Sequence, residues 1–216
     1  TLMDDKTDQR AHQELVKAAK ERWNITGNPE DIWNEFEHHL RKFESTISTR
    51  WISGKQRFVD AMETLIKRKL NPVERYWFLC EYRRFHKLYV RLFPETPTVL
   101  RFVKNRFVHV GLISNIDDDY LYFELERTGI LEFFDSITTS SGVGFGKPNA
   151  KIFDIALKKA SMKSEDSFYV GNSIKYDVKP ANQVGMQTIL ISEKDCDEAD
   201  YVIPNIGGLI NLFNPL

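Results

Sequence analysis

The chain has 216 residues, 42% of them hydrophobic, so it can bury a sizeable core as one large domain or as a core with an insertion. Its formal net charge of -1 at pH 7 argues against a nucleic-acid partner or an anionic membrane surface. No apolar run approaches the roughly 18 residues of a membrane helix, so we expect no membrane partner and a cytoplasmic protein. The pattern does not indicate an oligomeric state.

Residues 8–92 are predicted to be helical, with short breaks. Asn28-Pro29 and Asn71-Pro72 are each typical of a helix N-cap followed by proline at the first helical position. Apolar side chains recur at helical spacing on two of these segments: Phe58, Met62, Leu65 and Ile66, and then Phe78, Tyr82, Phe85 and Tyr89. The segment 8–92 is therefore predicted to form an all-helical domain.

From Pro94 onwards, short predicted strands alternate with predicted helices. The strands are expected at 107–113, 136–139, 168–170, 188–191 and 201–203, and the helices at 98–105, 117–128, 149–160, 178–184 and 209–213. This alternation predicts an α/β, Rossmann-like parallel sheet with helices on both faces, built from residues 1–7 and 93–216. In such sheets, ligands bind outside the carboxyl ends of the strands.

Two predicted loops at those ends carry groups suited to an anion. Ser114 and Asn115 follow a strand and precede a helix, where they either hold a phosphate oxygen or cap the helix. Lys147 follows a glycine-rich run that is not a nucleotide-binding P-loop, because Pro148 stands where serine or threonine is required. Lys147 is either a surface lysine or a fixed cation that pairs with a carboxylate and a phosphoryl group.

A third loop offers oxygen ligands. Asn172 and Asp177 follow the predicted strand that ends at Gly171. An amide and a carboxylate at a strand end are either a turn with a cap or ligands of Mg²⁺, which takes few protein ligands and keeps several waters.

Taken in order, these segments resemble the haloacid dehalogenase-like (HAD) hydrolase superfamily. The residues that carry the resemblance are Ile113-Ser114-Asn115, then Lys147-Pro148-Asn149-Ala150-Lys151-Ile152-Phe153, then Tyr169-Val170-Gly171-Asn172-Ser173 with Asp177, Pro180-Ala181-Asn182 and Gly185-Met186. Their order and spacing match the second, third and fourth motifs of that superfamily. The segment 8–92 resembles the helical cap domain that its phosphoglycolate phosphatase and dehalogenase branch inserts after the first motif.

The resemblance implies a role for each matching residue. Ser114 would hydrogen-bond a phosphoryl oxygen, and Lys147 would orient the nucleophile and neutralise charge. Thr1 and Asn115 would contribute to substrate binding, and Asn172 and Asp177 would hold Mg²⁺ directly or through water. Thr1 resembles the last residue of the first motif, so the nucleophilic and acid/base aspartates of that motif, and the strand that carries them, are expected upstream of Thr1.

The implied activity is a Mg²⁺-dependent phosphatase that acts on a small phosphorylated metabolite through an aspartyl-phosphate. One position departs from the pattern, because Asn172 stands where these phosphatases usually have aspartate. A 2-haloacid dehalogenase, which would need no metal, is the alternative enzyme, although the spacing of Asn172 and Asp177 is that of the phosphatases. A non-catalytic HAD-like protein is a further alternative if the nucleophile is absent.

Overall fold

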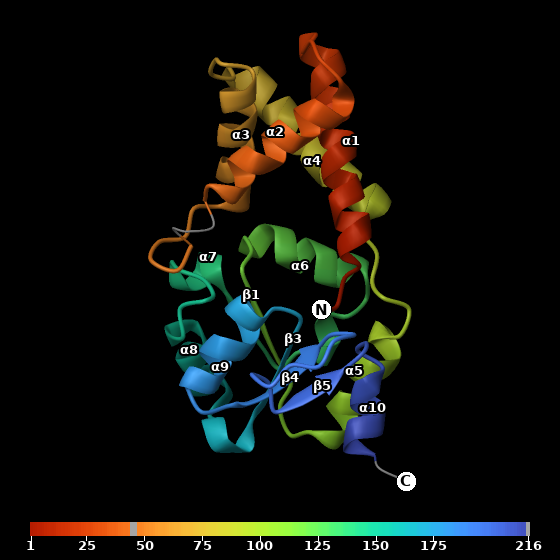
Figure 1. Cartoon of the computed structure of the whole chain (residues 1–216), viewed down its shortest axis with the longest axis vertical. Coiled ribbons are helices and arrows are strands. Elements are labelled where there is room, and N and C mark those ends of the chain that lie inside the picture. Colours follow the sequence, from red (N-terminus) through yellow and green to blue (C-terminus); the bar gives the residue numbers. More distant parts are fainter. Residues whose placement is uncertain (44–46, 215–216) are drawn as a thin grey trace. The chain divides into compact units, whose positions relative to one another are not determined.

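The computed structural model describes residues 1–43 and 47–214, which divide into two compact units. An α/β unit contains Thr1–Leu2, Ile47–Trp51 and Leu92–Leu216, and a helical unit contains Met3–Thr46 and Ile52–Arg91. Figure 1 shows the helical unit in red to yellow and most of the α/β unit in green to blue. The segment Ile47–Trp51 lies in the α/β unit although it falls inside the predicted helical segment, and the predicted domain boundaries stay a prediction.

The helical unit has four helices within its described residues: α1 (Asp5–Trp23), α2 (Pro29–Arg41), α3 (Gly54–Leu65) and α4 (Pro72–Tyr89). Helix α1 packs on α4, and α2 packs on α3. Both predicted caps are confirmed: Asn28 accepts a hydrogen bond from the Glu30 amide, and Asn71 forms a reciprocal capping box with Glu74. Nowhere in residues 1–43 and 47–214 is a helix long and apolar enough to cross a membrane.

A buried carboxylate holds the turn between α3 and α4. Glu63 is 8% exposed, and it accepts hydrogen bonds from the Leu70 amide at 3.1 Å and from the Lys69 ammonium at 2.6 Å. Burial alone would raise the pKa of Glu63, but the bonds from Lys69 and Leu70 outweigh that effect and hold it below its usual range. The ionised form of Glu63 is therefore the one that stabilises the turn.

We expect Glu63→Gln to lower the free energy of unfolding by about 1–3 kcal/mol near neutral pH, because a buried charge-assisted interaction is lost. Since the pKa of Glu63 is lower in the folded state, its contribution is present above the unfolded pKa and is lost as pH falls through the folded value. Urea unfolding at neutral and acid pH should show the difference between wild type and variant shrinking with acid. The exposed Glu21, changed to glutamine, is the control that should leave stability nearly unchanged.

The α/β unit holds two parallel sheets within its described residues. Strand β1 (Gly111–Ser114) pairs with β2 (Ser136–Thr139), and the second sheet has the order β3-β4-β5, with β3 at Phe168–Gly171, β4 at Gln187–Ile191 and β5 at Tyr201–Ile203. The predicted parallel α/β class is thus confirmed. The prediction of a strand from residue 107 was wrong for residues 107–110, because Phe107 terminates a helix and Val108 is 89% exposed.

Helices cover both faces of these strands. They are α5 (Thr96–Arg106), α6 (Asp118–Arg127), α7 (Ser140–Val143), α8 (Lys151–Ala160), α9 (Lys179–Gln183) and α10 (Gly208–Phe213). On β1, Leu112 packs with the buried residues of α5 and α6, whereas Ile113 packs with those of α8 and α9. On β3, Val170 packs with the cluster that includes α5 and α10, and Tyr169 packs with α8 and α9. Because neighbouring strand residues point to opposite faces, α5, α6 and α10 lie on one face and α8 and α9 on the other.

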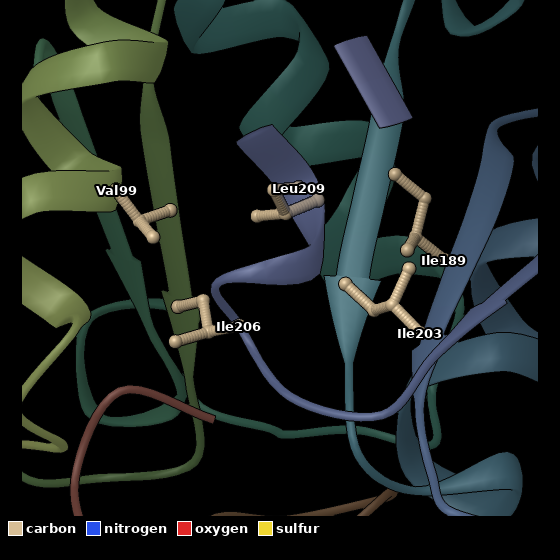
Figure 2. Packing of buried hydrophobic residues seen from close by; sticks show 5 residues of the cluster. All are labelled: Val99, Ile189, Ile203, Ile206 and Leu209. Atoms are coloured by element: carbon tan, nitrogen blue, oxygen red, sulfur yellow. The ribbon is translucent and has the colours of Figure 1, made fainter. Parts of the chain in front are cut away.

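Figure 2 shows the cluster on the face covered by α5 and α10. Val99 from α5 and Leu209 from α10 pack with Ile189 of β4 and Ile203 of β5, and each of these side chains is nearly or fully buried. Burying one such side chain stabilises the fold by roughly 1.5–3 kcal/mol relative to leaving it in water. This core fixes β4 and, through pairing, the neighbouring β3, whose carboxyl end carries the candidate site.

Candidate active site

The buried carboxylate of Asp177 is the centre of the site. Its Oδ1 accepts hydrogen bonds from the Lys147 ammonium at 2.5 Å and from the Tyr169 hydroxyl at 3.2 Å. Its Oδ2 accepts from the backbone amides of Asn172 at 3.1 Å and Ser173 at 3.0 Å. A carboxylate offers about four acceptor positions, so these four donors fix its orientation fully.

The chain after β3 places Asp177 by a wide helical turn. Residues Ile174–Val178 form a single π-helical turn, in which the Val178 amide reaches back to the Ser173 carbonyl. Single π-turns are often found at functional sites. The turn folds the Asp177 side chain over Gly171, where an added Cβ would lie 2.4 Å from both Cβ and Cγ of Asp177. Glycine at the end of β3 is therefore required by the position of the carboxylate.

Lys147 is held as a buried cation. Its side chain is 13% exposed, and its ammonium also donates to the Tyr169 hydroxyl oxygen at 3.0 Å. Burial would lower the pKa of Lys147, but Tyr169 and Asp177 outweigh burial and raise it. Burial raises the pKa of Tyr169 to about 12, so its phenol stays neutral and can donate to Asp177. Lys147, Tyr169 and Asp177 thus form a closed triangle of hydrogen bonds, in which the Lys147 ammonium is fixed by the Asp177 carboxylate.

Asn115 ties the loop after β1 to the backbone of Lys147. Its amide nitrogen donates to the Lys147 carbonyl at 2.8 Å, and its amide oxygen accepts from the Lys147 N–H at 2.7 Å. An added Cβ on Gly146 would lie 2.5 Å from that amide oxygen, which explains a glycine at this position. The neighbouring Ser114 ends β1, and its hydroxyl makes no hydrogen bond to a residue that the structure describes, so it is available to a ligand.

The segment Ile47–Trp51 lies along the loop that carries Lys147. Gly146 donates its amide to the Ile47 carbonyl at 2.8 Å, and the Trp51 amide donates to the Gly144 carbonyl at 2.7 Å. The Trp51 indole donates to Asp117 at 2.9 Å, at the start of α6. Residues that sequence reasoning assigned to the helical domain therefore line the loops around the site.

Thr1 binds Asn172, whose backbone amide donates to Asp177. The Thr1 hydroxyl donates to the amide oxygen of Asn172 at 3.1 Å, and Asn172 is exposed. The amide oxygen of Asn172 is an oxygen ligand of the kind that a hard cation such as Mg²⁺ binds. Asp177 offers no acceptor position for direct metal binding while its four donors are in place. The residues therefore fit Mg²⁺ through Asn172 directly and through Asp177 by way of water.

The predicted site residues fall into one connected set. Hydrogen bonds run from Thr1 to Asn172, from the Asn172 backbone to Asp177, and from Asp177 through Lys147 to Asn115. Ser114 adjoins Asn115 at the end of β1. Whether these residues act as predicted on a substrate or a metal stays a prediction.

Sequence reasoning assigned no role to Tyr169, which it named only as part of a strand and of the motif that runs to Ser173. A signal was available in the alternation of side chains along a strand, because Tyr169 and Gly171 share one face of β3. The aromatic ring packs edge-on against Phe153 of α8 with centroids 4.7 Å apart. The ring of Tyr169 packs on that face of β3, and the hydroxyl at the end of the side chain reaches the Lys147 ammonium.

Comparisons with known proteins find similar sequences and a similar fold. The sequence model of the haloacid dehalogenase-like hydrolase family matches residues 53–191. The chain is similar to a glyceraldehyde 3-phosphate phosphatase of Methanothermobacter thermautotrophicus, with 40% identity over 54% of this chain and 52% of the relative. It is 27% identical to a protein of the same name from Methanocaldococcus jannaschii, over 84% of this chain and 82% of that relative. The first alignment thus spans about half the length of the relative.

The fold is also that of a solved structure. The structure of the HAD-hydrolase YfnB from Bacillus subtilis, bound to magnesium, superposes with a TM-score of 0.77 and 18% identity. The match covers 95% of this chain and 92% of that structure. At this identity the likeness establishes the fold alone.

Proposed function

Because the chain belongs to the haloacid dehalogenase-like hydrolase family, we propose that it is a phosphatase that removes phosphate from a small phosphorylated metabolite. The observation that carries the proposal is the buried Lys147 ammonium, fixed by Asp177 and Tyr169 beside the strand-end loop of Ser114. A fixed cation in a dry site stabilises the charge that develops on a transferring phosphoryl group. Two relatives named glyceraldehyde 3-phosphate phosphatase support a phosphorylated sugar of that size as the first substrate to test.

Each residue has a role in this proposal. Lys147 provides the positive charge, and Asp177 and Tyr169 hold that charge in place. Ser114 offers its hydroxyl to a phosphoryl oxygen, and Asn115 positions Lys147 through the backbone bonds at 2.7 and 2.8 Å. The nucleophilic and acid/base aspartates that the resemblance implies upstream of Thr1 stay a prediction, as does the cytoplasmic location.

We also propose that Mg²⁺ is the cofactor. Asn172 would supply the direct protein ligand through its amide oxygen, and Asp177 would act through water, since its oxygens already accept four bonds. A bound Mg²⁺ would neutralise negative charge on the phosphoryl oxygens. One neutral amide ligand and one carboxylate that acts through water give the site little negative charge. Mg²⁺ should therefore bind weakly unless phosphate oxygens also coordinate it.

A 2-haloacid dehalogenase is the second candidate, and Asn172 favours it because an amide lowers the charge available to a metal. The test uses protein expressed from its complete gene, supplied in turn with p-nitrophenyl phosphate, glyceraldehyde 3-phosphate and 2-chloropropionate. We expect phosphate release that needs Mg²⁺ and stops with EDTA. Chloride release that EDTA leaves unchanged would establish the dehalogenase instead, and the absence of both activities would count against both enzymes.

A further inference from the structure

Three potential metal ligands meet inside the helical unit, apart from the residues discussed above. Asp8 and His12 lie on α1, His86 lies on α4, and one ligand atom from each lies within 4.8 Å of the others. The Asp8 carboxylate is 3.9 Å from Nδ1 of His12 and 3.5 Å from Nδ1 of His86. We propose that Asp8, His12 and His86 bind a divalent transition-metal ion, for which Zn²⁺ is the best match, and that this ion joins α1 to α4.

The helices already place the three groups as such a site requires. Asp8 and His12 are four residues apart on α1, so both side chains project from one face of the helix. That face packs against α4, which presents His86 to it. The ligands therefore come from two helices whose contact does not depend on the ion.

The distances between the Asp8 carboxylate and the two imidazoles suit a shared tetrahedral ion better than direct hydrogen bonds between these side chains. Metal bonds of 2.0–2.1 Å place the ligand atoms of a tetrahedral Zn²⁺ site about 3.3 Å apart. The distances from Oδ1 of Asp8 to His86 and from Oδ2 of Asp8 to His12, 3.5 and 3.9 Å, exceed that value by a few tenths of an ångström, and neither is a good hydrogen bond. Side-chain rotations would have to bring the three ligand atoms, which lie within 4.8 Å of one another, to that separation around an ion.

The surroundings leave the ion one route of entry. The side chain of His86 is 2% exposed and that of His12 is 17% exposed, whereas that of Asp8 is 44% exposed. The ring of Tyr82 packs against His86 at 4.3 Å, and that of Phe58 packs against His12 at 4.7 Å. Aromatic rings thus pack around the two histidines, and the site is accessible to solvent at the Asp8 carboxylate. A water molecule can enter there and take the fourth coordination position of the ion.

The ligand chemistry separates this site from the proposed Mg²⁺ site. Imidazole nitrogens select Zn²⁺, Co²⁺ or Ni²⁺, whereas Mg²⁺ prefers oxygen ligands. Binding can therefore be measured in an excess of Mg²⁺, which occupies oxygen sites and does not compete for imidazole nitrogens. The proposal does not depend on the phosphatase activity.

The experiment is a calorimetric titration of EDTA-stripped full-length protein with Zn²⁺ in an excess of Mg²⁺. We expect saturation at about one equivalent and a melting temperature that rises with Zn²⁺. His12→Gln and Asp8→Asn should abolish both effects, whereas His38→Gln, at an exposed histidine of α2, should leave both intact. Failure of wild type to bind Zn²⁺, or unchanged binding by His12→Gln, would overturn the proposal.

Co²⁺ provides a readout of the ligands themselves. In wild type it should give the visible absorption bands of a four-coordinate ion, and these bands should be lost in His86→Gln. His86 is almost fully buried, so circular dichroism must show that this variant is folded before it is used. If His86→Gln is not folded, Asp8→Asn and His12→Gln test the Co²⁺ bands in its place, because the side chains of Asp8 and His12 are partly exposed. Six-coordinate bands in wild type would contradict the tetrahedral site.

Discussion

Replacing Lys147 by methionine should reduce phosphatase kcat/KM by a factor of about 10²–10³, the usual cost of removing one group that stabilises transition-state charge. Methionine keeps an unbranched side chain as far as Cε but lacks the ammonium that lies 2.5 Å from Asp177. The buried carboxylate loses its charged partner, and breaking such a pair costs about 3–5 kcal/mol of stability. Steady-state kinetics and urea unfolding of protein expressed from its complete gene measure the two effects.

Lys151→Met is the matched control. Lys151 lies four residues along the chain from Lys147, at the start of α8, and is exposed. Its replacement should leave kcat/KM unchanged. It should change the free energy of unfolding by no more than about 0.5 kcal/mol, as for most surface substitutions. Equal effects of the two variants, or full activity of Lys147→Met, would show that Lys147 is not the cation of the site.

Gly171→Ala is expected to damage both the fold and the activity. The new methyl group would lie 2.4 Å from Cβ of Asp177, closer than carbon atoms approach in real structures. Overpacking costs about 1–3 kcal/mol, and moving the carboxylate off its four donors adds to that cost. A total of about 3 kcal/mol would lower Tm by roughly 6–12 °C in a domain of this size. Thermal unfolding and phosphate release should both show the loss.

Gly111→Ala tests whether this effect belongs to the site. Gly111 is also a strand glycine, at the start of β1, and an added Cβ there meets the Ser136 hydroxyl oxygen at 3.3 Å. The Ser136 hydroxyl, which is hydrogen-bonded to His109 at 2.8 Å, needs to shift only slightly, so we expect a stability change below about 1 kcal/mol and unchanged turnover. If Gly171→Ala is as mild as Gly111→Ala, Asp177 is not held over Gly171 as described.

Much of the fold could be predicted because the local signals were strong. The proline after each capping asparagine marked the starts of α2 and α4 at Pro29 and Pro72. The strand prediction at 136–139 was confirmed, and three of these four residues, Ile137, Thr138 and Thr139, are β-branched, which favours a strand. The strand start at residue 107 was misplaced because Phe107 and Val108 have strand-like side chains, whereas the preceding helix ends at Phe107.

The site was harder to predict than the fold, since its contacts join distant segments. Motif order brought Lys147 and Asp177 together as a hypothesis, and the structure places their charges 2.5 Å apart. Strand alternation placed Tyr169 on the same face as Gly171, but it could not show that the Tyr169 hydroxyl reaches Lys147 on another loop. Nor did any pattern show that Trp51 would bind Asp117, because these residues belong to segments of different predicted domains.

The most direct test of the proposed site is a crystal structure of protein expressed from its complete gene with Mg²⁺ and orthovanadate. We predict vanadate oxygens at hydrogen-bond distance, about 2.7–3.1 Å, from the Lys147 ammonium and the Ser114 hydroxyl. Mg²⁺ should lie about 2.1 Å from the amide oxygen of Asn172, with Asp177 reached through water. Vanadate bound elsewhere, or bound with the Lys147 ammonium directed away from it, would contradict the account.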